Sequence, residues 1–383
     1  MRTRLLAISS LFICLSLFEL HGEWQRAPMM TGQNLNSVIF LDSLFLAIGD
    51  SGVILSSTDG ENWVFEESGT TRNLHHISGY DSLIIIGGDS GTIVSSIHRN
   101  PWNMMQLQDS AKISRVAVGP KAALAWRANR NSLWRRGPDN NWTFGHAGGL
   151  VNGLVWERNR FVGLGGNLIS LSSDGIFWTG ETVNTANVTD LAVDNDTFFA
   201  SNMYGGIYRL QPAFPNNDEF WNRTLIGTLG KIPFNSSFKG IDACNGSRLV
   251  VGDSGLAISF RSSDSLYIET TNTAIDLNDA ALGTYASVIV GDSGLILYQE
   301  APQTAAKRKR SAAPQWSGNS RLPAFTNRQI RLPSAGSWEI SIHQLNGRLL
   351  LRRRVTVSEA CKTDISVPIS SSLLYSLKKT PNE

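Results

Sequence analysis

Four serines of this sequence lie in one short motif, Gly-Asp-Ser-Gly, which sets a hydroxyl between a carboxylate and two flexible backbone positions. The motif covers residues 49–52, 88–91, 252–255 and 291–294. A catalytic serine needs one dedicated histidine base and one orienting acid. Four copies, spaced 39 residues apart within each pair (49 to 88, and 252 to 291), do not fit such a single site. The motif therefore indicates a role in backbone geometry.

Histidine is the other residue type that could carry chemistry here. His75 and His76 are adjacent, and the remaining histidines of the mature chain are His98, His146 and His343. A metal ion needs several ligands that converge at fixed geometry, and these positions are scattered. We expect His75 and His76 to be polar binding or core residues, one of them facing a central channel, and we expect no metal site and no cofactor.

The serine motifs belong to an internal repeat, which decides the fold. Degenerate copies of the turn fall at residues 129–131, 165–167 and 204–206, between the two outer pairs. Together the copies mark seven units of roughly forty residues, which is the length of a four-stranded propeller blade. We therefore predict an all-β chain with a seven-bladed β-propeller over residues 23–300.

Each unit has the same expected order of strands. In the first unit, strands are expected over residues 37–40, 43–48, 53–56 and 62–65. The turn between the second and third strands needs a positive φ, which Gly adopts freely and Asp tolerates. The aspartates of these turns should accept hydrogen bonds from the backbone amides that follow them. These residues are Asp50, Asp89, Asp253 and Asp292.

A second turn motif joins the third strand to the fourth in two units. It reads Ser-Thr-Asp-Gly-Glu-Asn-Trp at 57–63 and Ser-Ser-Asp-Gly-Ile-Phe-Trp at 172–178. The aspartate should close the turn, the glycine should permit it and the tryptophan should cover the blade edge. These residues are Asp59, Gly60, Trp63, Asp174, Gly175 and Trp178. The motif resembles the Asp-box (BNR repeat) turn of sialidase-like propellers, although here Trp follows Asp by four residues rather than five.

The last unit lacks a fourth strand, because it ends at residues 295–298. Residues 23–26 (Glu-Trp-Gln-Arg) match the tryptophan-bearing fourth strand of other units, so we predict that the N-terminal strand closes the last blade. With glycine-rich turns after apolar strands and Ser/Thr-x-Asp-Gly turns before Trp, residues 23–300 resemble seven-bladed propellers related to the photosystem II stability and assembly factors. The resemblance implies a fold that many secreted bacterial proteins use for other purposes.

The first 22 residues have the pattern of a secretory signal peptide. A basic start (Met-Arg-Thr-Arg) precedes an apolar stretch over 5–18 that is short for a membrane span, and cleavage is expected after Gly22. A retained N-terminal anchor is the alternative. We expect export to the extracellular space or the outer-membrane surface, with the periplasm as the alternative, and no transmembrane segment after cleavage. Cys244 and Cys361 then remain, and their pairing stays open.

The chain changes character after residue 300. Residues 301–323 form a linker with the basic run Lys307–Arg310, and residues 324–383 are expected to form a small β domain of a sandwich-like kind. A strand over 337–343, the turn Leu-Asn-Gly-Arg at 345–348 and a second strand resemble the C-terminal sorting domain of the type IX secretion system. That resemblance implies contact with secretion machinery. The net charge of +2 predicts no nucleic-acid partner.

Two units carry large side chains where the others have plain turns. Trp126, Arg127 and Tyr204 fall at the face that carries the turns between second and third strands, and Trp and Arg are typical anchors of interfaces. We predict a binding site for a protein or glycan there, together with His75 and His76.

The expected function is a secreted or cell-surface binding or scaffold propeller without catalysis, acting in protein or glycan interaction or envelope assembly. A sialidase-like glycoside hydrolase or another glycan-active enzyme is the alternative, and a purely structural surface protein is the third hypothesis. A sialidase needs clustered arginines and a Tyr/Glu pair, and nothing in the spacing assembles them. The candidate residues would be Arg115, Arg127, Arg135, Arg160, Tyr204 and Tyr208.

Overall fold

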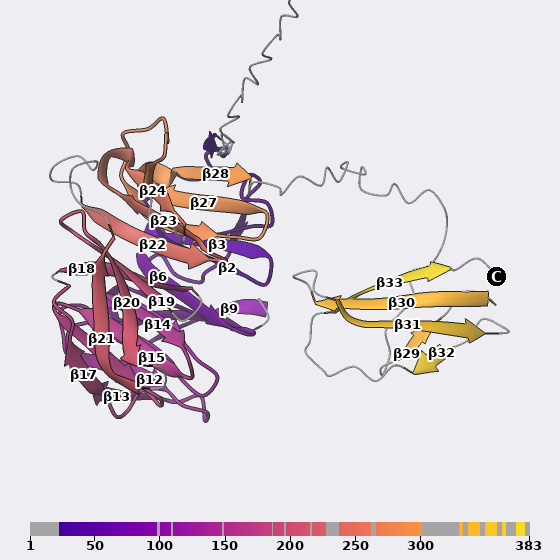
Figure 1. Ribbon diagram of the computed structural model, residues 1–383, viewed down its shortest axis with the longest axis horizontal. Helices are drawn as coiled ribbons and strands as arrows, with labels where there is room; N and C mark the ends of the chain where they lie inside the picture. The colour runs from indigo at the N-terminus through magenta and orange to yellow at the C-terminus, as the bar shows by residue number, and fades with distance from the viewer. Residues whose placement is uncertain are drawn as a thin grey trace, which may run out of the picture.

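The computed structural model shows seven antiparallel four-stranded sheets arranged as the blades of a propeller, so the predicted fold is confirmed (Figure 1). The described residues are 23–300 without 98–99, 109, 148, 186, 195–196, 215–216, 227–236 and 262–265, together with five strands between residues 329 and 379. They contain no α-helix, and therefore no helix that is long and apolar enough to span a membrane.

The blades follow one another along the chain, each from its inner to its outer strand. Blades 1 and 2 are β2 (Leu35–Leu41), β3 (Leu44–Gly49), β4 (Ile54–Ser57), β5 (Val64–Glu66), and β6 (Leu74–Tyr80), β7 (Leu83–Gly88), β8 (Thr92–Ile97), β9 (Asn100–Gln106). Blades 3 and 4 are β10 (Ile113–Val118), β11 (Ala123–Arg127), β12 (Ser132–Arg136), β13 (Trp142–His146), and β14 (Gly153–Glu157), β15 (Arg160–Gly165), β16 (Leu168–Ser172), β17 (Thr179–Thr182).

Blades 5 and 6 are β18 (Val188–Asp194), β19 (Thr197–Asn202), β20 (Ile207–Phe214), β21 (Asn217–Leu225), and β22 (Phe238–Cys244), β23 (Ser247–Gly252), β24 (Ala257–Phe260), β25 (Tyr267–Ile268). Blade 7 has β26 (Leu277–Leu282), β27 (Ala286–Gly291) and β28 (Ile296–Glu300). We call the face where the inner strands begin the upper face, and the face where they end the lower face.

The N-terminal strand completes the last blade, as predicted. The two residues of β1 (Gln25–Arg26) pair antiparallel with Tyr298 and Leu297 of β28. Trp24, next to this strand, is buried with residues of blades 6 and 7 and donates a hydrogen bond to Glu269 Oε2 at 3.3 Å. The chain thus fastens its start to its last blade, where β1 covers the edge of β28 and becomes the outer strand.

The hydrophobic core lies between the blades rather than at a single centre. Seven clusters of buried side chains join adjacent sheets, one at each of the seven seams. At the seam of blades 1 and 2, for example, Ile48 and Ile54 pack with Ile77 and Ile86, all of them almost inaccessible to solvent. Apolar burial at each seam therefore holds the ring, and polar groups are left for the channel and the two faces.

A bulge near the start of most inner strands aims two successive side chains away from the core. In β2 the pairing shifts between Leu35 and Ser37, and β6, β10, β18, β22 and β26 shift at the matching place. The first residue after the buried one is the bulge position, and the second is the channel position. Bulges re-aim side chains in this way in many sheets, often next to functional sites.

Beyond the propeller the described residues form two small antiparallel sheets. One pairs β29 (Gln329–Arg331) with β32 (Lys362–Asp364), and the other has the order β31 (Leu349–Val357), β30 (Gly336–Gln344), β33 (Leu373–Lys379). A strand was expected over 337–343, and β30 covers it. The predicted signal peptide, the predicted linker, the predicted turn at 345–348 and Cys361 lie outside the described residues.

Candidate functional site

The four Gly-Asp-Ser-Gly turns are short 3₁₀ turns on the upper face, η1 (Asp50–Gly52), η2 (Asp89–Gly91), η3 (Asp253–Gly255) and η4 (Asp292–Gly294). In η1 the positive φ falls on Ser51 (56°) and Gly52 (76°), not on Asp50. A Cβ at Gly52 would overlap the carbonyl oxygen of Thr70, so only glycine fits. The predicted positive φ at glycine is therefore confirmed, whereas the second residue that adopts it is Ser51 rather than the aspartate.

The aspartate side chains of these turns also have a different partner from the expected one. Asp50 Oδ1 accepts a hydrogen bond from Asn36 Nδ2 at 2.9 Å, and Asp292 Oδ1 accepts one from Asn278 Nδ2 at 2.8 Å. Asp89 bonds to His75, and Asp253 pairs with Lys239. Each partner is the bulge residue of the same blade. The turn thus orients one inner-strand side chain. The predicted hydrogen bonds from the following backbone amides to these carboxylates are not seen among the described residues.

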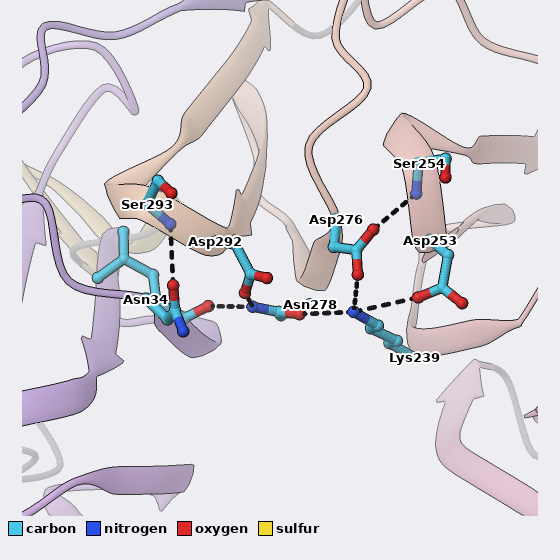
Figure 2. Close-up of polar contacts among 9 residues, drawn as sticks. Asn34, Lys239, Asp253, Ser254, Asp276, Asn278, Asp292 and Ser293 are labelled. Carbon is cyan, nitrogen blue, oxygen red and sulfur yellow. Dashed lines mark hydrogen bonds and ion pairs between the residues drawn. The ribbon is translucent and has the colours of Figure 1, made fainter.

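The bulge residues and turns then join neighbouring blades (Figure 2). Asn278 Nδ2 also donates to the carbonyl oxygen of Leu35 in blade 1 at 3.0 Å. The backbone N–H of Ser293 donates to Asn34 Oδ1 at 3.0 Å across the same seam. Ser254 N–H makes the matching bond to Asp276 Oδ1 at 2.8 Å from blade 6 to blade 7. The serines of the motif therefore serve through their amides, and their role is to hold the ring.

Lys239 occupies the bulge position of blade 6 and adds charge to this network (Figure 2). Its Nζ lies 2.9 Å from Asp276 Oδ2 and 3.1 Å from Asp253 Oδ1, and it also donates to Asn278 Oδ1 at 3.3 Å. Burial alone would lower the pKa of Lys239, but the two carboxylates outweigh it and raise the pKa. The lysine thus stays charged and ties blade 6 to blade 7.

The described histidines near the turns do not form a serine-activating pair. His75 Nε2 lies 2.7 Å from Asp89 Oδ1, and His76 Nδ1 accepts a hydrogen bond from the backbone N–H of Val116 at 3.3 Å. Burial lowers the pKa of His75 and lowers that of His76 much further, so both favour the neutral form. Among the described residues, no three His, Cys, Asp or Glu side chains are placed to hold a metal ion.

The Asp-box-like turns on the lower face act as expected. Asp59 Oδ1 accepts hydrogen bonds from the backbone N–H groups of Glu61 and Asn62, and Asp174 Oδ1 accepts those of Ile176 and Phe177. These bonds outweigh the burial that would raise the pKa of either aspartate, so both pKa values are lowered.

The glycines and tryptophans of these turns complete the motif. Gly60 and Gly175 have φ values of 82° and 75°. Trp63 is buried and donates from Nε1 to the carbonyl oxygen of Gly60 at 2.8 Å. Trp178 packs edge to face on Trp126 with ring centroids 5.3 Å apart. All of these residues have structural roles.

The upper-face hypothesis needs one correction. Trp126 is fully buried (0% exposed), because it packs on Trp178 in the seam of blades 3 and 4 and donates from Nε1 to the carbonyl oxygen of Arg130 at 3.1 Å. It is a core residue and cannot anchor a partner. Arg127 donates to Ser132 Oγ at 2.9 Å and lies over the ring of Phe144.

Tyr204 fits the hypothesis better, because it is 59% exposed in the turn of blade 5. Its hydroxyl accepts a hydrogen bond from Asn187 Nδ2 at 2.9 Å. Met203, beside it, is 47% exposed and lines a depression of about 420 Å³ on the upper face. The depression extends over blades 3 to 6 and is lined by Arg115, Asn152, Asn187, Val188, Thr189, Met203, Ser237, Phe238 and Lys239.

Arg115 lines this depression and connects blade 3 to blade 5. Its Nη2 donates to the carbonyl oxygen of Thr189 in blade 5 at 2.7 Å, and Nη1 donates to that of Ser114 at 2.8 Å. Blade 4, which it crosses, has Gly153 at the channel position, so no side chain there competes for the space. The candidate sialidase arginines do not converge, since Arg135 instead donates to the carbonyl oxygen of Asp174 at 2.6 Å.

The channel below holds a second cavity of about 380 Å³ that reaches the lower ends of the inner strands. It is lined by His76, as expected for one of the two histidines, and by three acids that the sequence analysis did not single out, Asp190, Asp242 and Asp279. A signal for them exists: Asp190 and Asp279 each lie two residues after the buried residue that begins an inner strand. Lys239 and Asn278 lie one residue after such a buried residue. The bulge aims the side chains of the first and the second residue away from the hydrophobic core.

No known protein-family profile matches the chain, and no curated protein matches its sequence. Solved structures resemble it in fold. A structure of YCF48 bound to D1 peptide is 16% identical, with a TM-score of 0.59 over 75% of this chain and 98% of that chain. YCF48 from Cyanidioschyzon merolae is 14% identical, with a TM-score of 0.58 over 74% and 99%. A streptogramin B lyase is 10% identical, with a TM-score of 0.62 over 73% and 98%. These identities support the fold alone.

Proposed function

We propose that this chain is a non-catalytic binding propeller that holds a segment of another polypeptide on its upper face. The observation that carries the proposal is the depression over blades 3 to 6, with Met203 and Tyr204 exposed at its side. The same face of blades 6, 7, 1 and 2 is occupied by turns and side chains that bond to one another. A ligand therefore meets unoccupied surface on one half of the ring.

The chemistry of the depression suits a peptide. Methionine adapts its shape to apolar side chains, and an exposed tyrosine offers a rigid apolar ring with a polar end. Asn152 and Asn187 use their Nδ2 groups to bond Val188 and Tyr204, an arrangement that turns each Oδ1 to other donors. Backbone N–H groups of an extended segment are donors of this kind. Among proteins of the same fold, YCF48 bound to D1 peptide provides a precedent for a peptide ligand.

A displayed random-peptide library tests the proposal. Peptides enriched on the whole chain should bind Met203→Asp and Tyr204→Ala variants at least about tenfold more weakly, a loss of about 1.4 kcal/mol. The matched control is Phe177→Ala, because Phe177 is 80% exposed on the lower face. Equal binding by all variants would place the peptide site elsewhere and contradict the proposal.

A glycan-active enzyme is the competing hypothesis, and one of the structural neighbours is a lyase. A glycan array and a panel of fluorogenic glycosides separate the two. The enzyme would be favoured if any glycoside is turned over, if the Met203→Asp variant keeps this turnover, and if no peptide is enriched from the library. Peptide binding without turnover supports the binding propeller.

We further propose that the chain is exported and that its C-terminal region addresses it to the cell surface. The support is the signal-like pattern of residues 1–22 and the tail that resembles a sorting domain. Deletion of residues 2–22 should keep the protein inside the cell. Removal of residues 324–383 should leave it in a compartment that precedes the cell surface on the export route. Cell fractionation of both truncated chains measures this directly, and surface display of either would contradict it.

A further inference from the structure

Asp279 lies where the ring closes. It occupies the channel position of β26 in blade 7, and its Oδ2 accepts hydrogen bonds from Ser37 Oγ at 2.7 Å and from the Val38 N–H at 2.9 Å. Both partners belong to β2 of blade 1. Its Oδ1 accepts the N–H of Ala280 in its own strand at 2.8 Å. One buried carboxylate thus joins the last blade to the first.

Two more acids repeat the arrangement at the preceding seams. Asp242 Oδ2 accepts the N–H of Leu282 at 2.7 Å and so joins blade 6 to blade 7. Asp190 Oδ2 accepts the N–H of Ile241 at 3.1 Å and joins blade 5 to blade 6. Three successive seams therefore carry a carboxylate from an inner strand, and all three carboxylates line one cavity.

Few charges face these acids from the other inner strands. Strand β10 brings Arg115 and β6 brings His76, while β2 and β14 bring Ser37 and Gly153 to this level. The remaining ionisable groups on β18 and β22 have other surroundings: Asp194 pairs with Arg248 at 3.0 Å, Lys239 turns to the upper face, and Cys244 lies at the lower end. Within the described channel, three carboxylates thus face one guanidinium, one neutral imidazole and the phenol of Tyr80 at the end of β6.

This surplus of buried negative charge favours protons. Burial raises the pKa of Asp279 to about 7, and repulsion from Asp190 adds to it. Burial likewise raises the pKa of Asp190 to about 6 although Arg115 opposes the rise, and burial raises the pKa of Asp242. Desolvation disfavours the charged form of an acid in this way.

The contact between Asp279 and Ser37 suits both protonation states. When the carboxylate is ionised, the serine hydroxyl donates to Oδ2. When Oδ2 carries the proton, its O–H donates to Ser37 Oγ over the same 2.7 Å, because a hydroxyl can rotate from donor to acceptor. We propose that Asp279 and Ser37 form a proton-dependent latch, which takes up a proton at the closing seam as the pH falls and thereby tightens the ring.

The direction follows from linkage. The pKa of Asp279 is higher in the folded chain than the ordinary value of 3.8. The folded chain therefore binds the proton more tightly, and this stabilisation is complete below pH 3.8 and is lost as the pH rises through about 7. His75 and His76 act in the opposite direction, because burial lowers their pKa values and the folded chain resists their protonation. A single substitution is needed to separate these contributions.

Thermal unfolding of the full chain between about pH 5 and about pH 8 tests the latch. The pH dependence of Tm should become flatter in Asp279→Asn, because the group that titrates is gone. Ser37→Ala should lower Tm at every pH, because the serine is a partner in both protonation states. The matched control is Ser56→Ala, since Ser56 is also buried and donates to Glu66 at 2.7 Å within blade 1. It should leave the slope unchanged.

The outcomes separate cleanly. A Tm profile of Asp279→Asn parallel to that of the unmodified chain would overturn the proposal, and so would a Ser37→Ala profile that coincides with it. If Asp279→Asn does not fold, infrared difference spectra of the unmodified chain with labelled aspartate decide. A carboxylic-acid carbonyl band that disappears as the pH rises through about 7 supports the latch, and its absence at lower pH overturns it.

Discussion

Blades 6, 7, 1 and 2 differ from blades 3, 4 and 5 in how their upper face is held. In the first group, each Gly-Asp-Ser-Gly turn binds a bulge side chain, as Asp292 binds Asn278 at 2.8 Å. Blade 5 replaces this with Asn202, whose Oδ1 accepts the N–H groups of Tyr204 and Gly206 at 3.0 and 2.7 Å. The turn of blade 5 is thus stabilised by hydrogen bonds within the turn itself.

The two groups share the backbone pattern that lies beneath. The N–H after the second strand donates to the carbonyl oxygen before the first strand in both, from Asp50 to Asn34 at 2.9 Å and from Ala128 to Lys112 at 2.8 Å. Blade geometry therefore needs only the backbone bond and the apolar seams. The polar side chains that bind the turns of blades 6, 7, 1 and 2 are an addition. Blades 3 to 5 keep only part of it, as Asn152 donates to the carbonyl oxygen of Val188 in blade 5 at 2.9 Å.

Replacement of a turn glycine should give the largest difference between the two halves. Gly52 has a φ of 76° and no room for a Cβ, whereas Gly166 in blade 4 has a φ of 57° and open space around it. Gly52→Ala should cost about 3 kcal/mol or more, and Gly166→Ala about 1 kcal/mol, because only the first adds a clash to the left-handed strain. Urea denaturation measures both. Equal losses would mean that the two turns are equivalent.

Loss of the arginine that bridges blade 3 to blade 5 should have the next largest effect. Arg115→Met removes the bond to Thr189 and the positive charge that opposes the rise in the pKa of Asp190. The expected cost is about 2 kcal/mol at neutral pH and smaller in acid, where Asp190 is protonated. Arg127→Met is the control, with an expected cost of about 1 kcal/mol for its hydrogen bond to Ser132 and its ring contact, both within blade 3. A similar loss in both variants would contradict the bridging role.

The fold could be predicted because its signals are local. Glycine-rich turns recur at blade spacing, apolar strands alternate with them, and the tryptophan of residues 23–26 matches the fourth strands that lie elsewhere. Each of these features depends on residues that are close together in the sequence, so one sequence is enough to recognise it. The C-terminal strands were less fully foreseen, since their pairing order of β31, β30 and β33 depends on contacts between distant residues.

The candidate site could be predicted only in part, because the ring brings distant residues together. Tyr204 was found as a large residue in a turn, and the same reasoning selected Trp126, which the seam of blades 3 and 4 buries. Arg115 contacts Thr189 from 74 residues away. Asp279 contacts Ser37 from 242 residues away. Both residues lie two positions after a buried residue that begins an inner strand, but the sequence does not reveal the bulge that turns their side chains into the channel.

A smaller effect is expected where one side chain links two blades of the group with Gly-Asp-Ser-Gly turns, blades 6, 7, 1 and 2. Asn278→Ala removes the bonds to Asp292 and Leu35, at an expected cost of about 1–2 kcal/mol. Asn187→Ala, in blade 5, removes an exposed hydrogen bond to Tyr204 and should change stability by about 0.5 kcal/mol or less. The free energies of unfolding compare them. If Asn187→Ala cost as much, a bond within blade 5 would matter as much to stability as a bond between two blades.

A smaller effect than that of Asn278→Ala should come from the ion pair that joins blade 6 to blade 7. Hydrogen bonds from Ser254 and Lys239 lower the pKa of Asp276, so its stabilisation is present above the ordinary pKa of 3.8 and is lost as the pH falls below it. Because the pair is about one third exposed, Asp276→Asn should cost about 1 kcal/mol or less, and high salt should reduce the cost further. Unfolding at two salt concentrations measures this. A cost that salt leaves unchanged would assign the effect to the hydrogen bond with Ser254 rather than to charge.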